Sequence, residues 1–197
     1  MARKKKPSPA AHLEVIPLGR VDTLAVSIVA ANLQTVMGLN ADILPPVPEP
    51  EYAYLPLRTQ YSAGKILCEL ESLGKGARFK LGVVDLDICS PILKFLFGES
   101  QLGGRAALVS LHRLAHDEPR LLYERAAKIG LHETAHLLGI GHCRAKGCLM
   151  AFSSNVEKLD SLPLRFCSAC EYEVSRSLKN TFGGNTPFGV DVPDQPR

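Results

Sequence analysis

The stretch that decides the fold is HETAHLLGIGH, residues 132–142. On a helix His132 and His136 lie one turn apart on the same face, so both imidazoles can reach one ion. Gly139 tolerates positive φ and can end that helix, which lets the chain turn back and bring in His142. Three protein ligands leave one coordination position open for water, as a catalytic zinc ion requires. Glu133 lies beside the metal-facing side, where a carboxylate can accept a proton from water on the metal.

A second group of candidate ligands follows at once. Cys143 and Cys148 flank the short basic loop RAKG, and Cys167 and Cys170 form a C-x-x-C pair. Four thiolates within so short a stretch predict a closed, tetrahedral structural zinc site. The alternatives are ordinary buried thiols or a redox-active C-x-x-C. Two further cysteines, Cys68 and Cys89, fall in an expected helix and strand, so we interpret both as inert, buried thiols.

The two groups together resemble a known family. HETAHLLGIGHCRAKGCLM (132–150), followed by CSAC (167–170), is similar to the archaemetzincins, zinc metallopeptidases of the metzincin clan, and FGESQLGGRAALVSLHRL (97–114) also resembles them. The resemblance implies a catalytic zinc on the three histidines, Glu133 as general base and a structural zinc on the four cysteines, so two Zn²⁺ per chain. It also makes Met150 the methionine of the turn beneath the zinc. Where other metzincins often place Tyr shortly after that methionine, this chain has Phe152.

The metzincin resemblance further implies an edge strand above the cleft that pairs with an extended peptide. We expect residues 105–111 to be that strand and to bind substrate main chain by β-augmentation. The expected partner is therefore a peptide or protein substrate. The main alternative is a zinc-stabilised peptide-binding module with little or no turnover, although a purely binding site would not need the base Glu133.

Charge and composition narrow the remaining classes. The chain has 197 residues and a net charge of +3, but residues 3–6 supply four positive charges, so the rest is near neutral at −1. Trp is absent and aromatic residues make up 6%, which disfavours a nucleic-acid partner. No apolar stretch approaches the ~20 residues of a membrane span, and the N-terminus lacks a secretory pattern. We therefore expect a cytoplasmic protein, with a monomer favoured and the oligomeric state left open.

The order of expected elements predicts an α/β fold with a mixed sheet in one metzincin-like domain. Strands are expected at 12–18, 79–88 and 105–111, and helices at 22–37, 59–73, 118–138 and 169–178, with an extended connection or edge strand at 43–50 and a hairpin or loop at 95–104. We expect a mobile basic tail at 1–10 and a catalytic domain at 11–182. That domain divides into an upper subdomain (11–142) with the active-site helix and a small, loop-rich, zinc-stapled lower one (143–182). Residues 183–197 are expected to be an irregular tail.

Four weaker candidates are interpreted as structural or solvated residues rather than site residues. His112 and His116 are four apart but have no acidic partner in the pattern. Asp85 and Asp87 would share one face of a strand, where solvation at the strand end explains them better than a metal pair.

Overall fold

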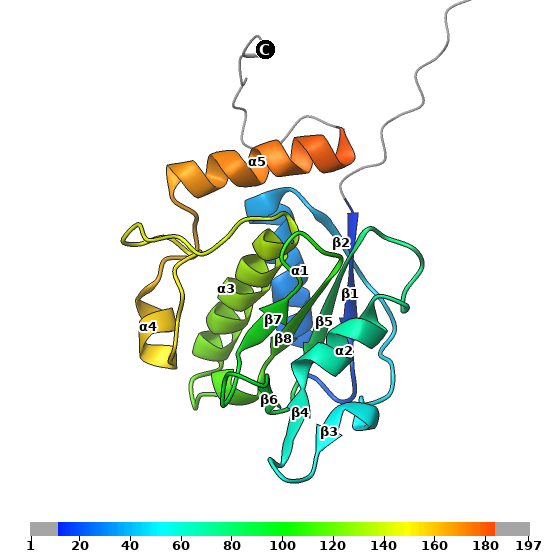
Figure 1. The fold of residues 1–197 in the computed structure, drawn as a ribbon. Coiled ribbons are helices and arrows are strands. Elements are labelled where there is room, and N and C mark those ends of the chain that lie inside the picture. The colour runs from blue at the N-terminus through cyan, green and yellow to red at the C-terminus, as the bar shows by residue number, and fades with distance from the viewer. Residues whose placement is uncertain (1–11, 184–197) are drawn as a thin grey trace, which may run out of the picture.

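The computed structural model describes residues 12–183, and these form an open α/β sheet (Figure 1). Five strands lie in the order β2-β1-β5-β8-β7, and the first four run parallel. Only β7 runs antiparallel, against β8. The mixed sheet expected from the sequence is confirmed. The strands are β1 (His12–Pro17), β2 (Asn40–Ile43), β5 (Phe79–Val84), β7 (Gly98–Ser100) and β8 (Ala106–Ser110).

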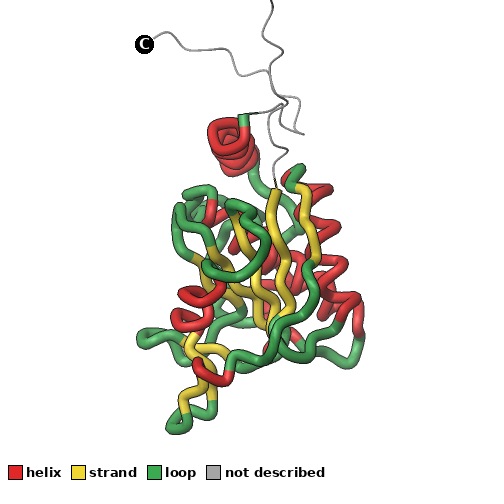
Figure 2. Tube along the Cα trace, turned by 90° about the vertical axis from the view of Figure 1, so that its right-hand side faces the viewer, coloured by secondary structure: helices red, strands yellow, loops and turns green. Residues whose placement is uncertain are grey.

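The sheet is covered on both faces, as Figure 2 shows from the side. The helices α1 (Thr23–Met37) and α3 (Pro119–Leu137) pack into one core on one face, and α2 (Ala63–Leu70) packs into a second core on the other. Because both faces are covered, β5 and β8 are buried at every position, as expected for continuous apolar strands. α1 and α3 approach closely at Gly130, where a Cβ would lie 2.7 Å from Val29 Cγ1.

Local sequence signals set several boundaries. The Asp22 side chain accepts hydrogen bonds from the first amides of α1, and Gly38 ends that helix in the left-handed conformation. The helix expected at 59–73 is shorter than expected. It begins at Ala63 because residues 60–62 form strand β4, and Ser62 caps the helix.

The strand expected at 79–88 is interrupted. β5 ends at Val84, and the chain reaches β6 (Ile88–Cys89) only after a break at residues 85–87. β6 joins a small separate sheet in the order β3-β4-β6, made with β3 (Tyr54–Leu55) and β4 (Gln60–Ser62). Two short 3₁₀ helices, η1 (Glu51–Ala53) and η2 (His112–Leu114), complete this part of the chain.

The expectation that residues 105–111 form an edge strand is wrong. They form β8, which lies between β5 and β7, so its main chain is paired on both sides. The edge beside the active-site helix is β7 instead. A three-residue strand is too short to show an alternating pattern, so the sequence analysis predicted only a hairpin or loop there.

After α3 the chain is mostly irregular. It contains α4 (Val156–Ser161), which the sequence did not predict, and α5 (Ser168–Phe182), which is longer than the expected 169–178. The tails expected at 1–10 and 183–197 lie outside the described residues, except for Gly183, which ends α5 in the left-handed conformation. No helix within residues 12–183 is long and apolar enough to cross a membrane.

Candidate active site

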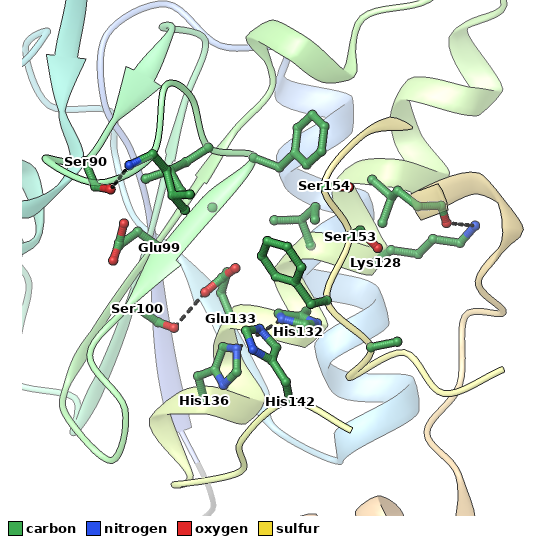
Figure 3. Close-up of a pocket in the computed structure, with 18 of the residues that line it drawn as sticks. Ser90, Glu99, Ser100, Lys128, His132, Glu133, His136, His142, Ser153 and Ser154 are labelled. Atoms are coloured by element: carbon green, nitrogen blue, oxygen red, sulfur yellow. Dashed lines mark hydrogen bonds between the residues drawn. The ribbon is translucent and has the colours of Figure 1, made fainter. Parts of the chain in front are cut away.

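The three histidines converge at the C-terminal end of α3 (Figure 3). His132 and His136 lie on its last two turns, and the chain then reverses through Gly139, whose φ is 83°. This reversal brings His142 back toward the helix. The candidate ligand atoms of the three residues all lie within 4.8 Å of one another. The structure therefore brings together the three side chains that the sequence singled out.

Backbone carbonyls fix the orientation of two of these rings. Nδ1 of His132 lies 2.9 Å from the Leu149 carbonyl oxygen, and Nδ1 of His136 lies 2.6 Å from that of Ile140. A carbonyl only accepts, so each Nδ1 carries the ring proton and each Nε2 has a free lone pair. The two Nε2 atoms nevertheless face each other at 3.0 Å.

Protonation does not resolve that contact, because burial lowers the pKa of His132 to about 4 and also lowers the pKa of His136. Two lone pairs this close are stabilised by a cation that both can bind. Neutral imidazoles whose Nδ1 atoms are held by carbonyls are the form in which histidine binds zinc. The donor set therefore fits a zinc ion.

Glu133 lies next to this group and is buried, with 7% of its surface exposed. Its Oε2 accepts a 2.6 Å hydrogen bond from the Ser100 hydroxyl on β7. Burial raises the pKa of Glu133 to about 8, and the Ser100 hydrogen bond acts in the opposite direction. A cation bound beside the carboxylate would also lower this pKa. Glu133 is thus a buried carboxyl group beside the histidines, with one oxygen held by Ser100.

Ser100 and Gly98 are site residues that the sequence reasoning missed. A Cβ at Gly98 would lie 2.7 Å from Glu133 Cγ, so only glycine lets β7 approach α3 this closely. Both residues lie in the segment FGESQLGG (97–104) that resembles the archaemetzincins. That resemblance was the available signal, but the sequence did not link this segment to Glu133.

A cleft of about 680 Å³ opens over the histidines and Glu133. On one side it is lined by β7, Ser90 and residues 92–97, and on the other by Leu149, residues 151–154, Leu159 and Leu162. Phe152 is exposed at the rim, and its ring centroid lies 5.3 Å from that of His142. Met150 is fully buried, and its carbonyl accepts a hydrogen bond from the Cys143 amide. Its expected place beneath the zinc stays a prediction.

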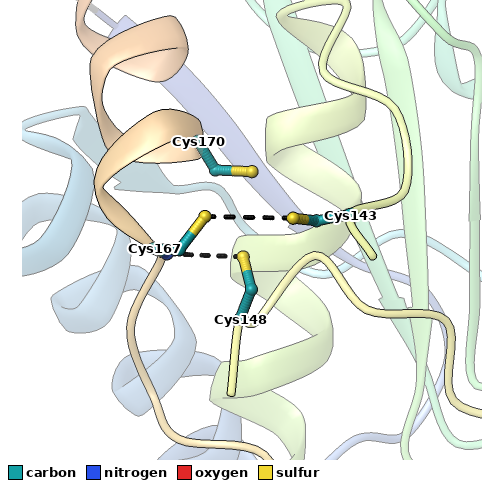
Figure 4. Close-up of side chains that lie close together, drawn as sticks. All are labelled: Cys143, Cys148, Cys167 and Cys170. Atoms are coloured by element: carbon teal, nitrogen blue, oxygen red, sulfur yellow. Dashed lines mark hydrogen bonds between the residues drawn. The ribbon is translucent and has the colours of Figure 1, made fainter. Parts of the chain in front are cut away.

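The four cysteines also converge (Figure 4). Their sulfur atoms all lie within 4.8 Å of one another, and every cysteine of the chain is a free thiol. The pKa of Cys167 is lowered to about 7, chiefly because the Cys170 amide donates to its sulfur. Burial raises the pKa of Cys148 and of Cys170. Four converging thiols with no disulfide among them form a donor set that fits a closed zinc site.

The other candidates take structural positions, with one exception. Cys89 is buried as expected, but Cys68 is exposed, because its position on α2 faces away from the core. Asp87 forms an ion pair with Arg113 and accepts a hydrogen bond from Gln60, and this ion pair lowers the pKa of Asp87.

The remaining three candidates are solvent-facing: His112, His116 and Asp85 are exposed.

Activation of water by zinc beside a carboxylate is the chemistry of zinc metallopeptidases, and comparison with known proteins places the chain in this class of enzyme. The model of peptidase family M54 matches residues 26–176, and the chain belongs to this family.

Archaemetzincins are among the similar proteins. The archaemetzincin of Methanopyrus kandleri is 38% identical over 130 residues, which cover 66% of this chain and 74% of that protein. The archaemetzincin of Methanocaldococcus jannaschii is 35% identical over 160 residues, covering 78% and 87%. The crystal structure of the Methanopyrus kandleri protein superposes with a TM-score of 0.80 at 30% identity and covers 88% of this chain and 99% of that one. A zinc-dependent peptidase from Methanocorpusculum labreanum superposes with a TM-score of 0.75 at 26% identity, covering 82% and 99%.

Proposed function

We propose that this metallopeptidase cleaves peptide bonds at a zinc ion held by His132, His136 and His142, with Glu133 as the general base. The observation that carries the proposal is the pair of imidazole Nε2 atoms facing each other at 3.0 Å, next to a buried carboxylate in one cleft. Zinc bound there supplies Lewis acidity, which acidifies a water molecule and polarises the scissile carbonyl.

The residues of the chain perform the proton transfers. Glu133 accepts a proton from the attacking water while the water oxygen bonds to the carbonyl carbon. It then delivers that proton to the amide nitrogen as the C–N bond breaks. His132 and His136 keep their Nε2 atoms directed into the cleft through the bonds from Nδ1 to backbone carbonyls. No tyrosine lines the cleft, so we assign no oxyanion donor among the described side chains.

The free edge of β7 supports a proposal for how a peptide binds. The Phe97 carbonyl accepts a hydrogen bond from the Ser110 amide, and the Gln101 amide donates to the Ala106 carbonyl, so both residues pair with β8. In an antiparallel pair the hydrogen-bonding direction alternates along the strand, so the main-chain groups of Gly98 and Ser100 point away from β8. An extended peptide that pairs with these groups lies along the cleft beside Glu133. We propose this edge, in place of residues 105–111, as the site of β-augmentation.

We also propose a second, structural zinc on Cys143, Cys148, Cys167 and Cys170, which makes two zinc ions per chain. The compact group of four free thiols supports it. The cleft separates two parts of the chain, which supports a division near residue 142 into an upper and a lower subdomain. The cytoplasmic location and the monomeric state stay predictions.

Digestion of an unbiased peptide library by wild type and Glu133→Gln tests the proposal. Both proteins should contain the same zinc, but the variant should cleave about 10²- to 10⁴-fold more slowly, the usual contribution of a general base. A variant that cleaves at the wild-type rate would show that Glu133 is not the base. Zinc-loaded wild type that cleaves no peptide would favour the alternative of a peptide-binding module.

A further inference from the structure

The Glu133 carboxylate has a single protein partner among residues 12–183, and that partner is Ser100. The Ser100 hydroxyl donates to Oε2 at 2.6 Å. The two residues are 33 positions apart in sequence and belong to different elements, β7 and α3. Figure 3 shows the bond spanning the space between them.

This bond makes the two carboxylate oxygens different. Oε2 is occupied by Ser100, whereas Oε1 accepts no hydrogen bond from the described part of the chain. Oε1 is not fully buried, and Glu133 lines the cleft, so solvent in the cleft can reach this oxygen. The hydrogen bond therefore leaves one named oxygen of Glu133, Oε1, open to the cleft.

The hydroxyl is held on a rigid support. Ser100 pairs with Ala107 of β8, and the next amide, that of Gln101, donates to the Ala106 carbonyl. In the loop after β7, the Gly103 amide donates to the His136 carbonyl at 2.8 Å. The strand that carries Ser100 is thus fixed both to the sheet and to the turn of α3 that carries His136.

We propose that Ser100 is a positioning residue for the reaction, whose hydroxyl holds Oε2 of Glu133 and leaves Oε1 free to accept the proton of the attacking water. The inference rests on the proposed role of Glu133 as the base. Because the outward main-chain groups of Ser100 lie on the free edge of β7, the same residue fixes the base and borders the proposed path of the peptide.

Steady-state kinetics on zinc-matched preparations test this. Ser100→Ala should lower kcat about 10- to 100-fold, the effect of losing a hydrogen bond to a charged group, with KM changed less than about threefold. Ser100→Thr keeps the hydroxyl and should recover most of kcat. Ser100→Val, whose side chain has the shape of threonine but no hydroxyl, should not. Ser27→Ala removes an exposed hydroxyl on α1 and should leave kcat unchanged.

A second readout does not depend on turnover. Denaturant unfolding of Ser100→Ala, Glu133→Ala and the double variant should show that the serine substitution costs less stability once Glu133 is absent. If Ser100→Ala does not fold, the comparison of Thr with Val at this position decides. Wild-type kcat in Ser100→Ala or Ser100→Val, or strictly additive stabilities, would overturn the inference. If Glu133→Gln is inactive in that case, the proposed function still stands.

Discussion

Replacing Gly98 with alanine should damage both stability and activity, because β7 has no room for a side chain there. An added Cβ would lie 2.7 Å from Glu133 Cγ, 2.8 Å from Ile129 Cγ2 and 2.8 Å from the Leu108 carbonyl oxygen. Ordinary contact begins at 3.4 Å, so β7 and its neighbours must separate by roughly 0.6–0.7 Å. The Leu108 oxygen belongs to the backbone of the paired strand, so rotation of a side chain cannot relieve all three contacts.

Overpacking of this kind costs about 1–3 kcal/mol. For a chain of this size the melting temperature should fall by about 3–10 °C. Moving β7 away from α3 also lengthens the Ser100–Glu133 hydrogen bond, so kcat should fall about 10-fold or more while the zinc content stays unchanged.

Gly64 provides the matched control for differential scanning calorimetry and peptide cleavage. It lies on the exposed face of α2, and a Cβ there would meet nothing within 4 Å. Gly64→Ala should therefore raise stability, by up to about 1 kcal/mol, and leave cleavage unchanged. If Gly98→Ala melts and cleaves like the wild type, the close approach of β7 to α3 is not needed.

Three further predictions concern the metal sites and the charged groups. Cys148→Ser should lower the melting temperature strongly and also weaken zinc binding at the histidines. His136→Ala should lose only the histidine-bound zinc, and metal analysis after dialysis separates the two outcomes. Asp160→Asn should cost about 1.5–3 kcal/mol at pH 7, because it removes the ion-pair partner of buried Arg125. The pKa of Asp160 is lowered in the fold, so this stabilisation is present above the unfolded value of about 4 and is lost as the pH falls; chemical denaturation at several pH values should show the cost shrinking. Burial raises the pKa of Glu99, which has no ion-pair partner among the described residues, so its charged form destabilises the fold. Glu99→Gln should therefore raise the melting temperature by about 1–3 °C at pH 8, where the carboxylate is charged, and hardly at all at pH 4.

The sequence predicted the convergence of the three histidines because the signals are local. The spacing of His132 and His136 on a helix, and a glycine that reverses the chain before His142, bring three imidazoles together through local structure. Only the orientation of the His132 ring also depends on a distant group, the Leu149 carbonyl. The cap at Asp22 is equally local. Such features depend on only a few neighbouring residues, so they survive in the fold.

The parts that the sequence could not predict depend on contacts between distant segments. The edge position of β7 follows from how three residues pair with β8, and the roles of Gly98 and Ser100 appear only when that strand lies against α3. Spacing along the chain carries little information about such packing.

The two donor groups are linked through one segment of the chain. Cys143 directly follows His142, and its amide donates to the Met150 carbonyl. The neighbouring Leu149 carbonyl holds the ring of His132, and Leu149 itself follows Cys148. A metal on the cysteines therefore fixes the loop that supplies one histidine and orients another. This coupling is reciprocal, but Cys167 and Cys170 reach the cluster from the start of α5 and keep that support when His136 is replaced. The proposed structural zinc thus acts on catalysis by holding the ring of His132 in place, and this explains why losing a cysteine should affect both sites.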